Sequence, residues 1–174
     1  MRWQEIDTMT CSLARTLSVV GDRWTMLILR DVFLGIRRFD AIQQDLRLTP
    51  HRLSDRLAKL VRNGILHRTA YEKHPRRFEY RLTEKGFDLY PLIATMTAWG
   101  DRWMAGRAGV PVELVHTPCG HSIRPELICP TCKSKIEARE MSARPGPALK
   151  GRPLPGQDSQ AKHKNVARPT ERAA

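Results

Sequence analysis

The sequence lacks the features that define several large classes of protein. No apolar run approaches the ~18 residues of a membrane-spanning helix, and the N-terminus has no signal-peptide hydrophobic region. It also contains no glycine-rich phosphate loop, no G-x-S-x-G nucleophile elbow and no H-E-x-x-H metalloprotease motif. We therefore expect a cytoplasmic protein that does not contact the membrane and is not an enzyme.

Acidic residues are scarce beside basic ones. The chain has 18 Asp and Glu against 30 Lys and Arg, which gives a net charge of +12. Such a charge favours polyanionic partners, because neutralising phosphates releases condensed counterions; the alternative is a soluble surface that happens to be basic. Residues 142–174 hold seven Lys and Arg against two Asp and Glu, so the rest of the chain still carries +7.

Two helices are expected in the N-terminal part. Apolar residues at helical spacing indicate a first helix over residues 12–20, which Gly21 ends. Asp22 suits the N-cap of a second helix over residues 23–34. Because this second helix is apolar over most of its surface, it should lie at the centre of the core. Gly35 supplies its C-terminal stop.

Residues 39–63 follow the pattern of a helix-turn-helix. A short helix with regularly spaced apolar residues is followed by a turn at residues 47–49. Thr49 is the expected N-cap of the second helix, and Pro50 is its first residue, where the missing N–H costs nothing. This second helix ends near Asn63, buries a leucine stripe and has a cationic outer face, which suits the major groove of DNA.

The outer face of this second helix is the candidate DNA-reading surface. His51, Arg52 and Arg56 are expected to reach bases or phosphates, while Ser54 and Asp55 cap or orient their neighbours. The alternative is a solvated helical face. The residues predicted to contact DNA here are Thr49, Pro50, His51, Arg52, Ser54, Asp55, Arg56 and Lys59.

A β-hairpin is predicted after this helix, because the periodicity changes to alternating. The two strands are expected at residues 65–71 and 77–82, and the turn at residues 72–76 has a basic tip. A hairpin in this position is a wing, whose cations can contact phosphates or the minor groove; the alternative is a solvated charged tip. The wing residues predicted to contact DNA are Lys73, His74, Arg76 and Arg77.

A long apolar face follows the hairpin. Residues 83–105 have helical periodicity and include Trp99 and Trp103, and Pro91 predicts a kink or a break near Tyr90. This face exceeds what one small core needs, so we expect it to be shared with a second subunit. The predicted homodimer joins through this helix and the first helix.

Several short motifs follow one another between Cys11 and Trp103. They are the opening Cys11, GDRWTMLILRD at 21–31, RRF at 37–39, LSDRL at 53–57, NGIL at 63–66 and EYRLTEKG at 79–86. In this order they resemble the HxlR family of winged helix-turn-helix regulators. The resemblance implies a dimeric bacterial transcription factor that binds a palindromic site in double-stranded promoter DNA. Several members sense oxidants or electrophiles through the N-terminal cysteine, and others sense small molecules or have no known effector, so the resemblance leaves the effector of this chain open.

Cys11 is the candidate redox sensor. A thiol next to a helix N-terminus can have a lowered pKa, which favours the reactive thiolate, and the resemblance adds sensing through the N-terminal cysteine. The alternative is a small buried hydrophobic residue. Many family members have proline after this cysteine, whereas this chain has Ser12.

A Cys- and His-rich unit at residues 111–137 is the candidate metal site. Three thiolates and one imidazole can close a tetrahedral structural Zn²⁺ site, although the first half reads C-G-H rather than C-x-x-C. The alternatives are a Cys129–Cys132 redox pair, a Cys119–Cys129 disulfide and a ribbon that has lost its metal. The predicted ligands are Cys119, His121, Cys129 and Cys132, with His116 as the alternative imidazole.

The fold class expected from these patterns is mainly α with a small β-hairpin, arranged as a dimeric winged helix-turn-helix. The predicted parts are a flexible N-terminus at 1–10, the winged domain at 11–105, the Cys/His-rich unit at 111–137 and a disordered basic tail at 142–174. The expected function is sequence-specific DNA binding. The alternative is a thiol- or zinc-dependent enzyme, or an interaction module, that uses the C-terminal cysteines.

Overall fold

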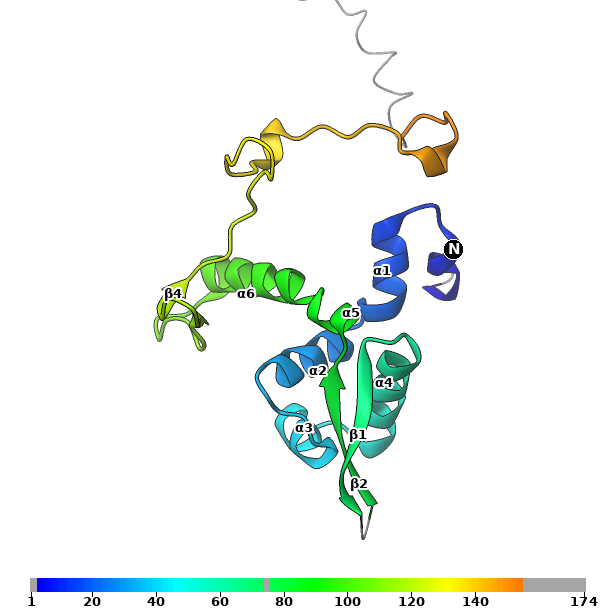
Figure 1. The fold of residues 1–174 in the computed structure, drawn as a ribbon, viewed down its shortest axis with the longest axis vertical. Coiled ribbons are helices and arrows are strands. Elements are labelled where there is room, and N and C mark those ends of the chain that lie inside the picture. The colour runs from blue at the N-terminus through cyan, green and yellow to red at the C-terminus, as the bar shows by residue number, and fades with distance from the viewer. Residues whose placement is uncertain (1–2, 74–75, 155–174) are drawn as a thin grey trace, which may run out of the picture. The chain divides into compact units, whose positions relative to one another are not determined.

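The computed structural model describes residues 3–73 and 76–154, so the predicted wing residue His74 lies outside the described residues. The mainly helical fold with a small antiparallel hairpin is confirmed (Figure 1). The helices are α1 (Ser12–Val20), α2 (Arg23–Phe33), α3 (Phe39–Leu46), α4 (Pro50–Arg62), α5 (Glu84–Phe87) and α6 (Tyr90–Met104), and the strands are β1 (Leu66–Lys73), β2 (Arg76–Leu82), β3 (Leu114–His116) and β4 (His121–Ile123).

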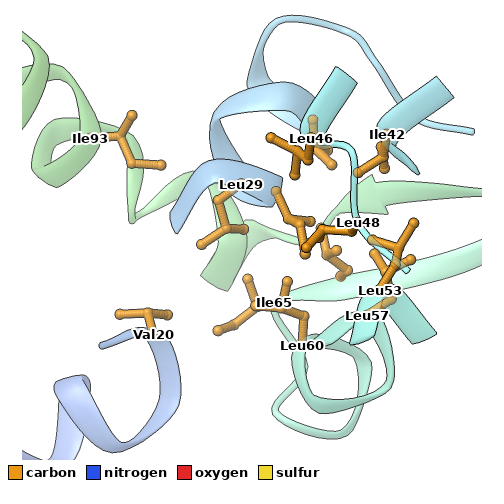
Figure 2. Packing of buried hydrophobic residues seen from close by; sticks show 13 residues of the cluster. Val20, Leu29, Ile42, Leu46, Leu48, Leu53, Leu57, Leu60, Ile65 and Ile93 are labelled. Carbon is orange, nitrogen blue, oxygen red and sulfur yellow. The ribbon is translucent and has the colours of Figure 1, made fainter. Parts of the chain in front are cut away.

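The hydrophobic core gathers around α2, as the sequence predicted. Ile28 and Leu29 of this helix are fully buried, and they belong to one cluster with the leucines of α4 and with residues of α3 and β1. Figure 2 shows side chains of three consecutive helices, among them Leu29 of α2, Leu46 of α3 and Leu53 of α4, gathered in this cluster. The helix-turn-helix and the base of the wing therefore share a single core, which fixes α4 relative to β1 and β2.

The ends of α2 follow the predicted capping residues. The carboxylate of Asp22 accepts a hydrogen bond from the N–H of Thr25 at 3.0 Å, which satisfies one free donor of the first turn. At the other end Gly35 adopts φ +89°, a left-handed conformation that favours glycine, and its N–H donates to the carbonyl of Val32. Both ends of the core helix are therefore set by local sequence.

The long helix predicted over residues 83–105 is interrupted where Pro91 indicated. The turn α5 ends at Phe87, and α6 begins at Tyr90 with proline in its first turn. The ring of Phe33 packs against the rings of Phe87 and Tyr90, with centroids 6.3 and 5.2 Å away. These aromatic contacts attach the break between α5 and α6 to the end of α2.

The wing is longer than the sequence indicated. Strands β1 and β2 pair antiparallel from Leu66↔Leu82 to Lys73↔Arg76, with a bulge between Ala70 and Glu72. The sequence predicts strands at residues 65–71 and 77–82 only. The residues near the tip are typical of turns, so their backbone pairing cannot be recognised from residue type. The segment before α3 also bridges β2, since the N–H of Tyr80 donates to the carbonyl of Arg37 at 2.8 Å.

Two short segments flank this domain. The N-terminal residues Trp3–Thr8 form a 3-10 helix, and β3 and β4 form a second small hairpin. The chain divides into the units Met1–Lys135 and Ile136–Ala174, and the described part of the second contains only short 3-10 helices. The disorder predicted for the tail stays a prediction, and residues 155–174 lie outside the described part.

Among the described residues, none of the helices is long and apolar enough to span a bilayer.

Candidate nucleic-acid interface

Helix α4 has the two-sided character of a recognition helix. Leu53, Leu57 and Leu60 are fully buried at a spacing that puts them on one face. The opposite face is exposed along the first two turns of the helix. Thr49 stands at the N-cap with extended backbone, but its side chain makes no capping hydrogen bond, in contrast to the expectation from sequence. The exposed residues of this surface are Thr49, Pro50, His51, Arg52, Ser54 and Asp55.

The cations of this face differ in how far they are committed to other groups. Arg56 donates through Nε to Oδ1 of Asp22 at 3.1 Å, so it ties α4 to the start of α2. His51 lies 3.3 Å from the carboxylate of Asp55, one turn along the helix. Arg52 is exposed and forms no ion pair in the described part of the chain. Within the described structure, Arg52 is therefore exposed and without an ion pair, whereas Arg56 links α4 to α2 through its Nε.

The environment of Asp22 stabilises its charged form. Partial burial raises its pKa, but hydrogen bonds from the side chain and backbone of Thr25 lower it, as do the nearby charges of Arg56 and Lys59. The balance holds the pKa of Asp22 below its ordinary value. This carboxylate caps α2 and also receives the side chain of α4, a link that sequence periodicity cannot reveal.

The base of the wing is hydrogen-bonded to the end of α4. The hydroxyl of Thr83 donates to the carbonyl of Gly64 at 2.6 Å and accepts the N–H of Gly86 at 3.1 Å. The ammonium of Lys85 donates to the carbonyl of Asn63 at 2.8 Å. The sequence segments 63–66 and 79–86 therefore meet in space, and they fix the wing relative to the candidate recognition helix.

The wing has several cations along its two strands. Arg77 pairs with Glu72 at 3.3 Å, and Arg68 lies over the ring of Phe78, with its guanidinium carbon 4.0 Å from the centroid. Arg38 stacks in the same way over the ring of Tyr71 at 4.6 Å. Sequence reasoning missed Arg38 and Arg68, although the RRF motif marked the first. The backbones of Lys73 and Arg76 pair at the tip, where the sequence placed them.

Helix α6 has an exposed apolar face. Leu92, Met96, Trp99 and Trp103 are 38%, 52%, 61% and 66% exposed. Their spacing of four, three and four residues puts them in one stripe along the helix. A stripe of this kind is unusual on the surface of a highly charged chain, and it corresponds to the dimer helix expected from sequence.

A cavity of about 740 Å³ lies beside α2, α3 and α6. Its lining is mainly apolar and includes Trp24 and Tyr90, but the carboxylate of Asp31 is also present and fully buried. Arg30 donates to Oδ1 of Asp31 at 2.9 Å, whereas Oδ2 has no partner in the described structure. Burial raises the pKa of Asp31, partly offset by the hydrogen bond and charge of Arg30. The volume is in the range of small-ligand sites, and no sequence signal indicated it.

The four cysteines are all free. Cys11 is exposed and stands at the N-cap position of α1, as the sequence predicted. Cys119 lies 3.2 Å from Nδ1 of His116, whereas the predicted ligand His121 lies across the hairpin from His116. Hydrogen bonds from Ser134, with a further one from Cys129, lower the pKa of the Cys132 thiol to about 7. Among the described residues, no group of three or more candidate ligands is arranged around one point.

Comparison with known proteins places this geometry in a family. The HxlR-like helix-turn-helix family matches residues 19–108. An uncharacterized HTH-type transcriptional regulator of Mycobacterium tuberculosis (strain ATCC 25618 / H37Rv) is 43% identical over 141 residues, which cover 81% of this chain and 89% of the relative. The HTH-type transcriptional regulator YdeP of Bacillus subtilis (strain 168) is 33% identical over 94 residues, which cover 53% of this chain and 73% of YdeP.

Comparison with solved structures also finds transcriptional regulators. The crystal structure of PA1607, described as a candidate transcription factor, superposes with a TM-score of 0.71 at 33% identity, covering 79% of this chain and 96% of PA1607. The redox regulator HypR in its oxidized form superposes with a TM-score of 0.51 at 30% identity, covering 55% of this chain and all of HypR. The fold and the arrangement of α4 and the wing are therefore those of transcriptional regulators.

Proposed function

The chain belongs to the HxlR-like helix-turn-helix family of DNA-binding transcriptional regulators, and from that premise we propose how it binds. A homodimer recognises a palindromic promoter site, each α4 enters the major groove, and each β1–β2 hairpin contacts the flanking backbone or minor groove. The observation that carries this proposal is the exposed face of α4, where Arg52 is uncommitted while Arg56 anchors the helix to Asp22.

The proposed dimer joins through α6. Its stripe of Leu92, Met96, Trp99 and Trp103 has the spacing of a coiled-coil seam, so a second copy can pack its own stripe against it. Burying exposed aromatic side chains of this size supplies a large hydrophobic driving force. To enter successive major grooves, the two copies of α4 related by the two-fold axis need to lie about 34 Å apart.

The test is a gel-shift measurement on duplex DNA from upstream of the gene for this protein. Replacing Arg52 with Ala should weaken binding by about 5- to 150-fold, because a good contact between arginine and a base contributes about 1–3 kcal/mol. Arg107→Ala removes the same charge from an exposed site outside α4 and the wing, so it should bind nearly as the wild type does. An Arg52→Ala protein that folds normally and binds with wild-type affinity would contradict the proposed interface.

We infer that the chain acts by binding DNA in the cytoplasm rather than by catalysis. The competing function, an enzyme or interaction module that uses the C-terminal cysteines, predicts preference for RNA or for a protein partner. The regulator predicts duplex binding that weakens steeply with salt, because each neutralised phosphate releases counterions. Titrations at two salt concentrations with duplex DNA and with RNA distinguish the two.

We also propose Cys11 as the thiol through which an oxidant acts. Support comes from its exposed position at the start of α1 and from the likeness to a redox regulator. Treatment with diamide should modify Cys11 and weaken DNA binding, and the Cys11→Ser protein should keep its affinity after the same treatment. Modified Cys11 with unchanged DNA binding, measured by mass spectrometry and gel shift, would reject a sensing role.

A further inference from the structure

Two short turns in the C-terminal part of the first unit repeat one design. The first has the sequence HTPCG at residues 116–120, and the second has CPTCK at residues 129–133. In each, the first and fourth residues carry soft metal-binding atoms, an imidazole nitrogen or a thiol sulfur. The spacing H-x-x-C therefore corresponds to the spacing C-x-x-C, which is the ligand spacing of one half of a zinc ribbon.

The backbones of the two turns match as well. In the first, the N–H of Gly120 donates to the carbonyl of His116 at 2.8 Å, and in the second the N–H of Lys133 donates to the carbonyl of Cys129 at 2.9 Å. Gly120 and Lys133 adopt φ +72° and +61°. A left-handed conformation is unfavourable for a lysine, so the second turn adopts this shape against the preference of its own sequence.

Each turn closes a pair of antiparallel segments. The first joins β3 to β4. The second turn lies between Ile128 and Lys135, which form an isolated antiparallel bridge. The N–H of Cys129 also donates to the carbonyl of Ser134 at 2.8 Å. The matching pairs of ligands are thus presented from two similar hairpin ends, which we call knuckles.

The separation of the ligand atoms in the first knuckle suits a metal. Nδ1 of His116 lies 3.2 Å from Sγ of Cys119. Bond lengths of about 2.1 Å to nitrogen and 2.3 Å to sulfur in a tetrahedral zinc site put these two atoms about 3.6 Å apart. The imidazole of this pair is His116, whereas sequence reasoning favoured His121.

This part of the chain has no hydrophobic core to hold the knuckles. Val115, Ile123, Leu127 and Ile128 are between 44% and 58% exposed. The cysteines are free, so no disulfide holds the turns in place. Small units that fold without a core commonly depend on a bound metal.

We propose that the two knuckles are the halves of one structural Zn²⁺ site whose ligands are His116, Cys119, Cys129 and Cys132. The described residues keep the two pairs apart, with no three ligands converging on one point. The metal therefore joins two preformed halves, and binding is coupled to the folding of residues 114–135. The three thiols release their protons to solvent on binding. Four protein ligands leave no open position, so the site is structural.

The experiment measures metal in the purified full chain and then repeats the binding with Co²⁺ after the metal is removed under reducing conditions. About one Zn²⁺ per chain is expected, and Co²⁺ should give the absorption of a tetrahedral site with thiolate ligands. His116→Ala, Cys119→Ser, Cys129→Ser and Cys132→Ser should each reduce the metal content severely. His121→Ala is the matched control, because it removes an imidazole from the same hairpin and should retain the metal.

Thermal unfolding of the winged-helix core is measured for each variant as a control. A cooperative transition shows that a variant with less metal is still folded. The proposal is overturned when the reduced wild-type chain binds neither Zn²⁺ nor Co²⁺. It is also overturned when His121→Ala loses the metal and His116→Ala keeps it. The readout does not involve DNA, so its failure is separate from failure of the proposed regulatory function.

Discussion

The winged-helix core and the knuckle segment, residues 114–135, are organised in opposite ways. In the core, α2 and α4 bury side chains such as Ile28, Leu53 and Leu57 almost completely. In the knuckle segment, most side chains are exposed and the order lies in backbone hydrogen bonds around two turns. Burial of apolar surface is a large and non-directional source of stability, whereas isolated turns gain little from their own hydrogen bonds.

Polar side chains therefore have different roles in the two regions. In the core domain, Asp22 and Thr83 link elements that hydrophobic packing already holds together. In the knuckle segment, the polar groups at His116 and Cys132 are the main candidates for holding the segment together at all. The two regions should therefore respond to different perturbations. The first two predictions below perturb one region while the other serves as the reference, and the last two perturb polar groups within the winged-helix core.

The largest effect is expected from a cavity in the core. Leu57→Ala removes a fully buried side chain of α4 and should destabilise the winged-helix domain by about 2–5 kcal/mol. Chemical denaturation measured by circular dichroism gives this value. The metal content of the folded fraction should stay unchanged. Loss of metal together with the loss of stability would show that the two regions are not independent.

Removing the metal should produce the converse result. A chelator under reducing conditions is expected to make residues 114–135 accessible to proteases and to hydrogen exchange, because the knuckles lose the ion that joins them. The melting temperature of the winged-helix core should change little. Exchange measured by mass spectrometry reports both regions in one experiment, and equal protection with and without chelator would contradict the coupling of metal and folding.

A smaller effect is expected at the link between α2 and α4. Asp22→Ala removes the cap of α2 and the partner of Arg56, and should cost about 1–2 kcal/mol of stability. Asp22→Asn keeps a capping group and should lose less. Thermal denaturation of the two variants measures the difference. An Asp22→Ala protein as stable as the wild type would mean that this link does not hold the recognition helix.

The smallest effect is expected on the pH dependence of stability. Asp22, the N-cap of α2, and Asp31, within α2, should change the free energy of unfolding with pH in opposite directions. The pKa of Asp22 is lowered in the folded protein, so its contribution is present above the ordinary aspartate pKa and is lost as pH falls through the folded value. The pKa of Asp31 is raised by burial, so stability declines as pH rises through that value. Relative to wild type, Asp22→Asn should gain stability towards low pH and Asp31→Asn towards higher pH.

Denaturation midpoints between about pH 3 and pH 6 test this pair of signs, since ordinary aspartates titrate near 4. Each variant is the control for the other, because both replace one carboxylate by an amide. The same pH slope in both variants would reject the assigned environments.

Local sequence was enough to predict the helices and the wing of the core domain but not their mutual contacts, and it did not indicate the 3-10 helix Trp3–Thr8. The caps Asp22 and Gly35 and the break at Pro91 depend on neighbouring residues, so they could be found from spacing alone. The pairing of Arg56 with Asp22 joins residues 34 positions apart, and periodicity assigns a face without naming a partner. Residues in the wing stacks, such as Arg68, were missed for the same reason.

The proposed metal ligands show a different limit. The C-G-H half of the sequence favours His121, two residues after Cys119, with His116 as the alternative imidazole. The H-x-x-C spacing from His116 is present in the sequence, but its equivalence to C-x-x-C depends on the matching backbone hydrogen bonds of the two turns. The unpaired oxygen of Asp31, by contrast, depends on burial by distant elements and has no sequence signal.

The most direct test of the regulatory account is a hydroxyl-radical footprint of the full chain on duplex DNA from upstream of the gene for this protein. A dimer of this kind should protect two stretches related by a two-fold axis, with centres about 10 base pairs or a multiple of this apart, because each α4 occupies one major groove. At a protein concentration near the wild-type dissociation constant, the Arg52→Ala protein should protect both stretches much less. A single protected stretch, or wild-type protection by the Arg52→Ala protein at this concentration, would contradict a dimer that reads DNA through α4.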